Sequence, residues 1–188
     1  MTRIVFFLEE RSAQEMLDGL LPRLLPQEAF SFQCIPFNGK GDLQKRLPIK
    51  LRGWRTPNTL FVVLQDQDSS DCHELKRLLA DLCDNAGKPE ALIRIVCREL
   101  ESWYLADLKA VERGLGMANL LKYQNAPRYR DPDKKPHPAK MLQRLTGGKY
   151  QKVAGSRAIG PHLDLDNTRS ASFRNFITGI RRIAGLVP

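Results

Sequence analysis

The alternation of short apolar runs with helical segments constrains the fold of this chain more than any other feature of its sequence. Apolar runs of strand length cover residues 3–8, 30–37, 60–64 and 91–97. The segments between them carry leucines at helical spacing. Strands that alternate with helices favour a mostly parallel sheet with helices on both of its faces. The sequence therefore predicts an α/β fold, and 188 residues are enough to bury its core without disulfides.

Local signals predict where several helices begin and end. Ser12 and Glu15 have the spacing of a capping box, so we expect the first helix to start after Ser12. Pro22 predicts a kink or an early end of that helix, and Asp71 is expected to cap the helix over residues 71–86. Beyond residue 100 the spacing predicts short helices, with turns between the last two of them. The expected ranges are 100–106, 108–115, 139–146 and 172–184 for the helices and 147–148 and 155–161 for the turns.

The charge is distributed unevenly along the chain. Residues 1–121 carry 16 Lys and Arg against 17 Asp and Glu, whereas residues 122–188 carry 14 against 4. This asymmetry predicts a nearly neutral domain over residues 1–121 and a basic, mostly helical extension over residues 122–188 that packs on it. Such an extension is typical of a surface that binds nucleic acid, although a solvated basic face or a surface for an acidic protein partner would look the same.

Several function classes are disfavoured by what the sequence lacks. The four cysteines include no C-x-x-C pair, which argues against a zinc ribbon and fits a reduced, cytoplasmic compartment. No apolar stretch approaches the roughly 20 residues that cross a bilayer, so we expect no membrane partner. The chain contains no G-x-x-x-x-G-K-[ST] motif, so any use of ATP must come from a partner.

Acidic residues follow three of the predicted strands. Glu9 follows the first strand, Asp66 and Asp68 follow the third, and Glu99 and Glu101 follow the fourth. The carboxyl ends of parallel strands meet at one edge of a sheet, and residues i and i+2 on extended backbone point the same way. Crowded carboxylates need a positive charge among them, and Mg²⁺ or Mn²⁺ is the natural candidate. Taken singly, each acid could instead be a helix cap or a surface partner of an arginine.

At these residues the chain resembles the TOPRIM superfamily, the metal-binding catalytic domain of topoisomerases, DnaG-type primases and OLD nucleases. The TOPRIM pattern is a glutamate after the first strand, an Asp-x-Asp after the third and another acid after the next strand. Over nearly its whole length the chain is also similar to a family of small stand-alone TOPRIM-like proteins. Members of that family are typically encoded beside AAA or ABC-type ATPases, often in anti-phage contexts. Its features are matched by residues 98–107, 149–152 and 169–173.

The resemblance implies a TOPRIM-like, Rossmann-like fold and a metal-dependent nuclease. The protein would be the effector subunit of an ATPase-linked anti-phage defence system. OLD nucleases also place a lysine near the metals and a further acid a few residues after the first glutamate. The lysine would be Lys149 or Lys152, but Ala13 stands in the region of the further acid, which leaves one or two metals open. The implied metal ligands are Glu9, Asp66, Asp68 and Glu101, with Glu99 as a second choice beside Glu101.

The proline-rich connection after residue 121 carries the candidate nucleic-acid-binding residues. Its cations can neutralise phosphates, and the interleaved Tyr123 and Tyr129 can stack on unpaired bases. The alternative is a solvated loop whose tyrosines pack on the body of the protein. The cations are Arg128, Arg130, Lys134, Lys135 and Lys140.

Two other functions remain open from the sequence. The protein could be a non-catalytic subunit with a TOPRIM-like fold that docks on an ATPase or binds nucleic acid. It could also be a phosphohydrolase that uses Asp66 as the nucleophile on a small phosphate ester. The second alternative explains the Asp-x-Asp motif, but it explains neither the glutamates nor the basic extension.

Overall fold

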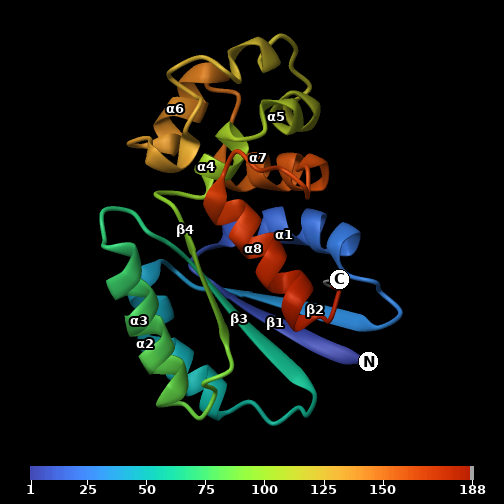
Figure 1. Ribbon diagram of the computed structural model, residues 1–188, viewed down its shortest axis with the longest axis vertical. Helices are drawn as coiled ribbons and strands as arrows, with labels where there is room; N and C mark the ends of the chain where they lie inside the picture. Colours follow the sequence, from blue (N-terminus) through green and yellow to red (C-terminus); the bar gives the residue numbers. More distant parts are fainter. Residues whose placement is uncertain (187–188) are drawn as a thin grey trace.

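Four parallel strands form one sheet at the centre of the molecule. The computed structural model describes residues 1–186. The strand order is β2-β1-β3-β4, and the register pairs Leu8 with Leu64 and Asp66 with Val96 (Figure 1). The predicted α/β fold with a parallel sheet is therefore confirmed, and the residues that follow Leu8, Asp66 and Val96 leave the sheet at the same edge. The strands are β1 (Thr2–Leu8), β2 (Phe30–Pro36), β3 (Thr59–Asp66) and β4 (Leu92–Val96).

Helices cover both faces of the sheet because the strand residues are apolar on both sides. Val5 and Phe7 of β1 pack with the leucines of α2 (Lys40–Arg52) and α3 (Cys72–Asp84). The intervening Ile4, Phe6 and Leu8 pack with α1 (Arg11–Leu24) and α8 (Ala171–Ile183). Figure 1 shows α2 and α3 together on one side of the strands and α1 and α8 on the other.

The remaining helices lie beyond one end of the sheet. They are α4 (Glu101–Leu105), α5 (Leu108–Leu115), α6 (Pro138–Leu145) and α7 (Lys152–Ile159), with short 3-10 turns at Leu121–Tyr123, Pro132–Lys134 and Gly160–His162. Figure 1 shows these helices grouped at the end where β4 runs into α4, which is the carboxyl end of the strands. Whatever binds at that edge of the sheet is therefore also next to the C-terminal part of the chain.

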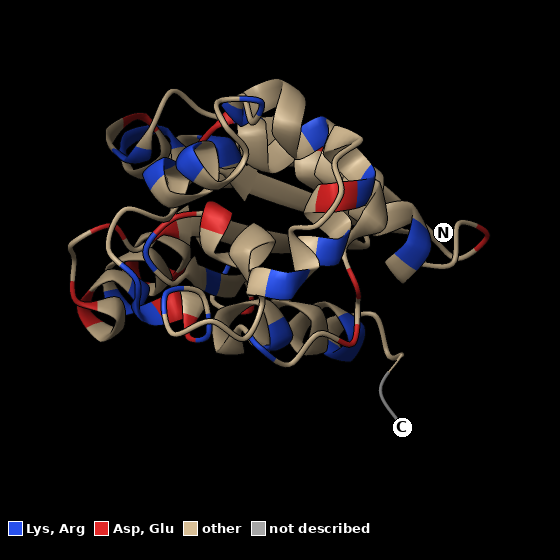
Figure 2. Cartoon of the chain, turned by 90° about the horizontal axis from the view of Figure 1, so that it is seen from above, with Lys and Arg blue, Asp and Glu red and all other residues tan. Residues whose placement is uncertain are grey.

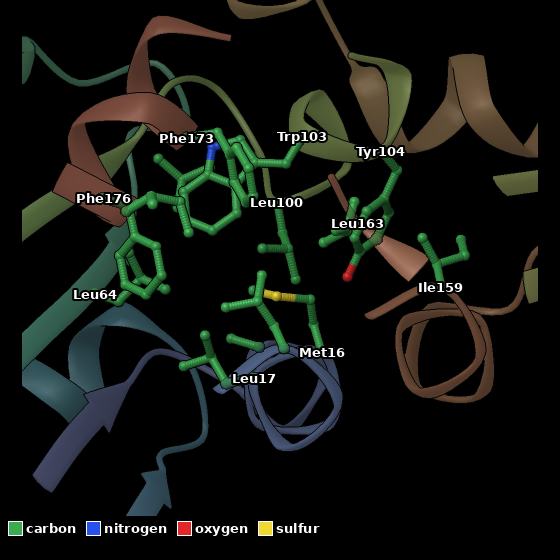
Figure 3. Packing of buried hydrophobic residues seen from close by; sticks show 14 of the residues in the cluster. Met16, Leu17, Leu64, Leu100, Trp103, Tyr104, Ile159, Leu163, Phe173 and Phe176 are labelled. Carbon is green, nitrogen blue, oxygen red and sulfur yellow. The ribbon is translucent and has the colours of Figure 1, made fainter. Parts of the chain in front are cut away.

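The C-terminal part packs tightly on α1 and α4. Met16 of α1, Tyr104 of α4 and Ile159 of α7 meet in one buried cluster (Figure 3). Trp103 packs between Phe173 and Phe176, with ring centroids 5.1 and 5.2 Å away. This cluster includes residues from both sides of residue 121. The division into a domain over residues 1–121 and an extension over residues 122–188 stays a prediction.

The sequence motifs at residues 98–107 and 169–173 form hydrogen bonds and packing contacts between α4 and α8. The indole Nε1 of Trp103 donates a hydrogen bond of 2.8 Å to Ser172 Oγ. Ser170 caps α8 by accepting from the backbone N–H of Phe173, and its hydroxyl donates to Asp133. The motifs over residues 98–107 and 169–173 therefore hold α8 against α4.

The local predictions for α1 are partly wrong. The helix begins at Arg11, so Ser12 lies inside its first turn and does not cap it. Glu15, the other half of the expected capping box, instead accepts two hydrogen bonds from Arg157 of α7. Pro22 neither ends nor visibly shortens the helix, which continues to Leu24. Within the described residues, no helix has the length and apolar character that crossing a membrane requires.

Two further helix predictions have opposite outcomes. Asp71 caps α3, as expected, by accepting from the backbone N–H groups of His73 and Glu74. The turn expected over residues 155–161 is instead largely the helix α7. Position 155 lies inside this helix. It requires glycine because the ring of Tyr150 occupies the space that a Cβ would fill.

Candidate functional site

Glu9 and Asp66 are joined at the carboxyl edge of the sheet. The carboxylate Oε2 of Glu9 accepts a hydrogen bond of 3.1 Å from the backbone N–H of Asp66. Asp66 is the last residue of β3, and its Oδ2 accepts one of 3.2 Å from the backbone N–H of Leu100. These two bonds tie the ends of β1 and β3 to the start of α4, where Glu101 is the first helical residue.

The electrostatics of Asp66 show that acids gather around it. Asp66 keeps some exposed surface, but its carboxyl group is surrounded by protein atoms. This burial, followed by the negative charges of Glu9, Glu101 and Glu10, raises the pKa of Asp66 well above its usual range, against a lowering by the N–H of Leu100. The structure therefore brings Glu9 and Asp66 together at the carboxyl edge of the sheet, and the charge of Glu101 also acts on Asp66.

Glu9 experiences the same crowding. Burial raises the pKa of Glu9, and the charges of Asp68 and Glu10 raise it further. The hydrogen bond from the N–H of Asp66 and the charge of Lys40 act in the opposite direction. The net direction is upward, so a cation placed among these groups would be bound favourably.

Glu101 is the most deeply placed of the acids. Its side chain is 0% exposed. The hydroxyl of Tyr150 donates a hydrogen bond of 2.8 Å to Oε1, whereas Oε2 has no hydrogen-bond partner. Burial raises the pKa of Glu101, although the bond from Tyr150 and the charge of Lys152 lower it. A buried carboxylate oxygen without a partner is costly, which makes Oε2 a candidate ligand for a cation.

The structure separates the two candidate lysines. Lys152, the first residue of α7, forms an ion pair with Glu10. Burial disfavours its charged form, but the bond to Glu10 and the charges of Glu10, Glu101 and Asp66 leave the pKa of Lys152 raised. Lys149 lies elsewhere: it is exposed, and its Nζ donates to the carbonyl oxygen of Gly116 at 3.3 Å. Lys152 is therefore the lysine that belongs to the acidic site.

Asp68 and Glu99 point to other partners. Asp68 has a left-handed backbone with φ of 53°, and its Oδ2 pairs with Nζ of Lys40 at 2.9 Å. Oε2 of Glu99 accepts a hydrogen bond of 2.8 Å from the backbone N–H of Ala139, near the start of α6. The expected i and i+2 alignment of each acidic pair is wrong, because β3 ends at Asp66 and β4 ends at Val96, so neither pair lies on extended backbone.

The residues at the centre fit a hard divalent cation. Within residues 1–186, no three side chains of His, Cys, Asp or Glu are arranged to hold one metal ion as they stand. Ligation would require the acids to turn toward one another. The donor chemistry is nevertheless appropriate, since Glu9, Asp66 and Glu101 offer carboxylate oxygens and one buried oxygen of Glu101 has no partner. These three residues would hold Mg²⁺ or Mn²⁺.

A basic groove lies on the C-terminal helices. We use this name for two adjoining cavities of about 450 and 510 Å³ that share Arg128 and Arg144 in their linings. Lys135 and Lys140 line the first cavity, and Tyr123, which is 40% exposed, lines the second. Figure 2 looks onto this end of the molecule and shows Lys and Arg on several of its helices and loops.

The predicted cations of the connection divide into two groups. Arg128, Lys135 and Lys140 line the basic groove, whereas the exposed Arg130 and Lys134 do not. Tyr129 is almost fully buried in the core, so it packs on the body of the protein and does not offer its ring to a base.

Two residues of these sites, Tyr150 and Arg144, are not predicted from the sequence. The position of Tyr150 between Lys149 and Lys152, inside a motif shared with the family, was the one available signal for its role.

The comparison with protein families matches nearly the whole chain to one family. Residues 8–181 match the family described as "Domain of unknown function (DUF4276)". The chain belongs to this family. No curated protein matches the sequence of this DUF4276 chain.

A solved structure supports the fold of the DUF4276 chain. It is the C-terminal region of the Burkholderia pseudomallei OLD protein, which is similar with a TM-score of 0.51 at 17% sequence identity. The match covers 98% of this chain and 99% of that chain. At this identity the likeness concerns the fold alone. Together with the parallel sheet and its flanking helices, it confirms the predicted α/β fold.

Proposed function

We propose that this DUF4276 protein is a metal-dependent nuclease that hydrolyses phosphodiester bonds in DNA or RNA. The observation that carries the proposal is the convergence of Glu9, Asp66 and Glu101 at the carboxyl edge of the sheet, with an unpaired buried oxygen on Glu101 and Lys152 beside it. The OLD nucleases, which the sequence resembles, use a corresponding set of acids, and the fold likeness to the OLD C-terminal region supports the assignment.

Each residue type has a physical task in this reaction. Mg²⁺ or Mn²⁺ bound by the acids would supply a polarised phosphate and an activated water. Lys152 holds positive charge next to Asp66 and Glu101, where it can offset the negative charge that develops on the phosphate. The cations of the basic groove can bind backbone phosphates, and Tyr123 offers an exposed ring to a base.

An ATPase partner is part of the proposal. The sequence has no P-loop motif, so ATP hydrolysis must be supplied by another subunit. We infer that the protein is the nuclease effector of an ATPase-linked anti-phage system, as the family resemblance implies. Co-purification with an AAA or ABC-type ATPase encoded beside its gene, and loss of phage resistance on Asp66→Asn, would test this inference. Full resistance in the variant would contradict it.

The nuclease assay compares matched variants of the full chain. EDTA-treated protein is returned to Mg²⁺ or Mn²⁺ and offered single- and double-stranded DNA and RNA. Asp66→Asn and Glu101→Gln should lower cleavage by about 10²-fold or more, because each removes a charge from the metal centre. Asp81→Asn is the control, since Asp81 is exposed on α3. Equal cleavage by wild type and Asp66→Asn would contradict the proposal.

A non-catalytic subunit is the second candidate function. It is favoured by the ion pairs Lys40–Asp68 and Lys152–Glu10, which already neutralise two of the acids, and by the lack of a ready ligand set within residues 1–186. Nucleic-acid binding without cleavage, in the presence of the ATPase and either metal, would establish this candidate and refute the nuclease.

A further inference from the structure

A second charged cavity lies along the free edge of the sheet. It has a volume of about 350 Å³ and is bounded by β4, α3 and α8. Its charged residues are Lys76, Arg94 and Arg182, and no Asp or Glu of residues 1–186 lines it. We call it the β4-edge site. None of the acids at the candidate metal centre contributes to it.

Arg94 is held in this cavity by contacts with β4 and α8. Its Nε donates to the carbonyl oxygen of Asn175 and its Nη1 to that of Ile93, both at 2.9 Å. A Cβ at position 179 would lie 2.3 Å from Nη2 of Arg94. Glycine inside a helix is usually unfavourable relative to alanine, so Gly179 in the middle of α8 is explained by the space that the guanidinium needs.

The guanidinium of Arg94 has donors to spare. Its two hydrogen bonds use two of the five N–H groups that an arginine offers. Arg182 lies close enough for the two positive charges to repel, which together with burial lowers the pKa of Arg94. Three cations line this cavity and no carboxylate of the described residues lines it, so a bound anion would offset their mutual repulsion and accept their free N–H groups.

We propose that the β4-edge site binds a phosphate monoester of about mononucleotide size. A dianionic phosphate matches Arg94, Arg182 and Lys76 better than a single carboxylate does, and arginine forks suit phosphate oxygens. A volume of about 350 Å³ is within the range of small-ligand sites and leaves room beyond the phosphate itself. The side chains of Ile95 and Thr178 also line the cavity and can contact the uncharged part of the ligand.

Calorimetric titration of the full chain with AMP, adenosine and inorganic phosphate tests the charge requirement. AMP is expected to bind and adenosine is not, because the cations recognise the phosphate. Binding of both with equal affinity would overturn the proposal. So would the absence of heat and of any thermal stabilisation with AMP, GMP, CMP and UMP. Binding of inorganic phosphate more tightly than every mononucleotide would overturn the assigned ligand size.

Variants on α8 locate the site. Arg182→Gln should weaken AMP binding at least about tenfold, because it removes one charged donor from the cavity. Arg174→Gln is the matched control, since Arg174 is exposed on the same helix and lines a different cavity. Equal weakening by both variants, or by neither, would overturn the proposal.

Two more variants test the role of Arg94 and the independence of the β4-edge site from the candidate metal centre. Gly179→Ala crowds Arg94 and should weaken AMP binding while the far-ultraviolet circular dichroism stays that of a folded protein. Unchanged binding in this variant would refute the role of Arg94. Asp66→Asn should retain full AMP binding, which keeps this test independent of whether the protein proves to be a nuclease.

Discussion

Replacement of Asp66 by asparagine is expected to stabilise the protein and to lower the proposed nuclease activity. Asparagine has nearly the same shape, and its Oδ1 can still accept from the N–H of Leu100, but it carries no charge to be repelled by Glu9 and Glu101. A buried polar group that lacks full compensation typically costs about 1–3 kcal/mol, and more when it is charged. For a chain of this length each kcal/mol corresponds to about 2–4 °C in Tm. A gain of about 2 kcal/mol would thus raise the Tm by about 4–8 °C in EDTA at pH 8.

The gain should depend on pH with a definite sign. Since the folded-state pKa of Asp66 is raised, its wild-type contribution to stability is greatest below the unfolded pKa, near 3.8, and is lost as the pH rises through the folded value. The difference in Tm between Asp66→Asn and wild type should therefore grow from pH 5 to pH 8. Mg²⁺ at about 100 times its Kd should stabilise wild type by about 2.7 kcal/mol and leave the variant unchanged.

Thermal unfolding followed by circular dichroism, with and without Mg²⁺, is the assay. The control is Asp81→Asn, which changes the same groups at an exposed position on α3 and should match wild type at every pH. A variant at Asp66 that is less stable than wild type in EDTA at pH 8 would refute the reasoning. A stability gain that is the same at pH 5 and pH 8 would refute it too.

Three other outcomes follow from the same geometry. Lys152→Gln should lower the single-turnover cleavage rate by about 10²-fold or more. Lys149→Gln should leave this rate nearly unchanged, because Lys149 is remote from the acids. Similar losses in both variants would contradict the assignment of Lys152 to the acidic site. Tyr150→Phe removes the hydrogen bond to Glu101 and should lower the free energy of unfolding, measured in urea, by about 1–3 kcal/mol. An unchanged midpoint of the urea transition would show that this hydrogen bond does not stabilise the protein. Arg144→Ala should reduce the salt dependence of nucleic-acid binding by about one unit of slope, so an unaltered slope would exclude the basic groove.

The strands and the sheet could be predicted from the sequence because each strand is rich in apolar and β-branched or aromatic residues and is followed by a segment of helical spacing. The parallel order then brings Glu9 and Asp66 to one edge whatever the details of the loops. What could not be predicted is the backbone beyond each strand end. The left-handed conformation of Asp68 and the immediate start of α4 at Glu101 depend on tertiary contacts, so the alignment expected from alternation failed for both pairs.

The helix α7 and the role of Tyr150 were missed for a related reason. A helix of eight residues with a central glycine has little intrinsic propensity, and its stability comes from packing on α1. Gly155 is accommodated because the ring of Tyr150 lies against it, and Tyr150 in turn reaches Glu101. Neither contact leaves a local pattern in the sequence. Ser12 likewise has the spacing of a cap, yet the helix starts one residue earlier at Arg11.

The contacts made by the C-terminal part show that it is a component of the acidic site. Three acids at the edge of the sheet are each bound by a residue after position 121: Glu10 by Lys152, Glu99 by Ala139 and Glu101 by Tyr150. The basic groove is built on the same helix, α6, whose first turn bonds to Glu99. The acids at the edge of the sheet and the cations of the basic groove are therefore linked through α6.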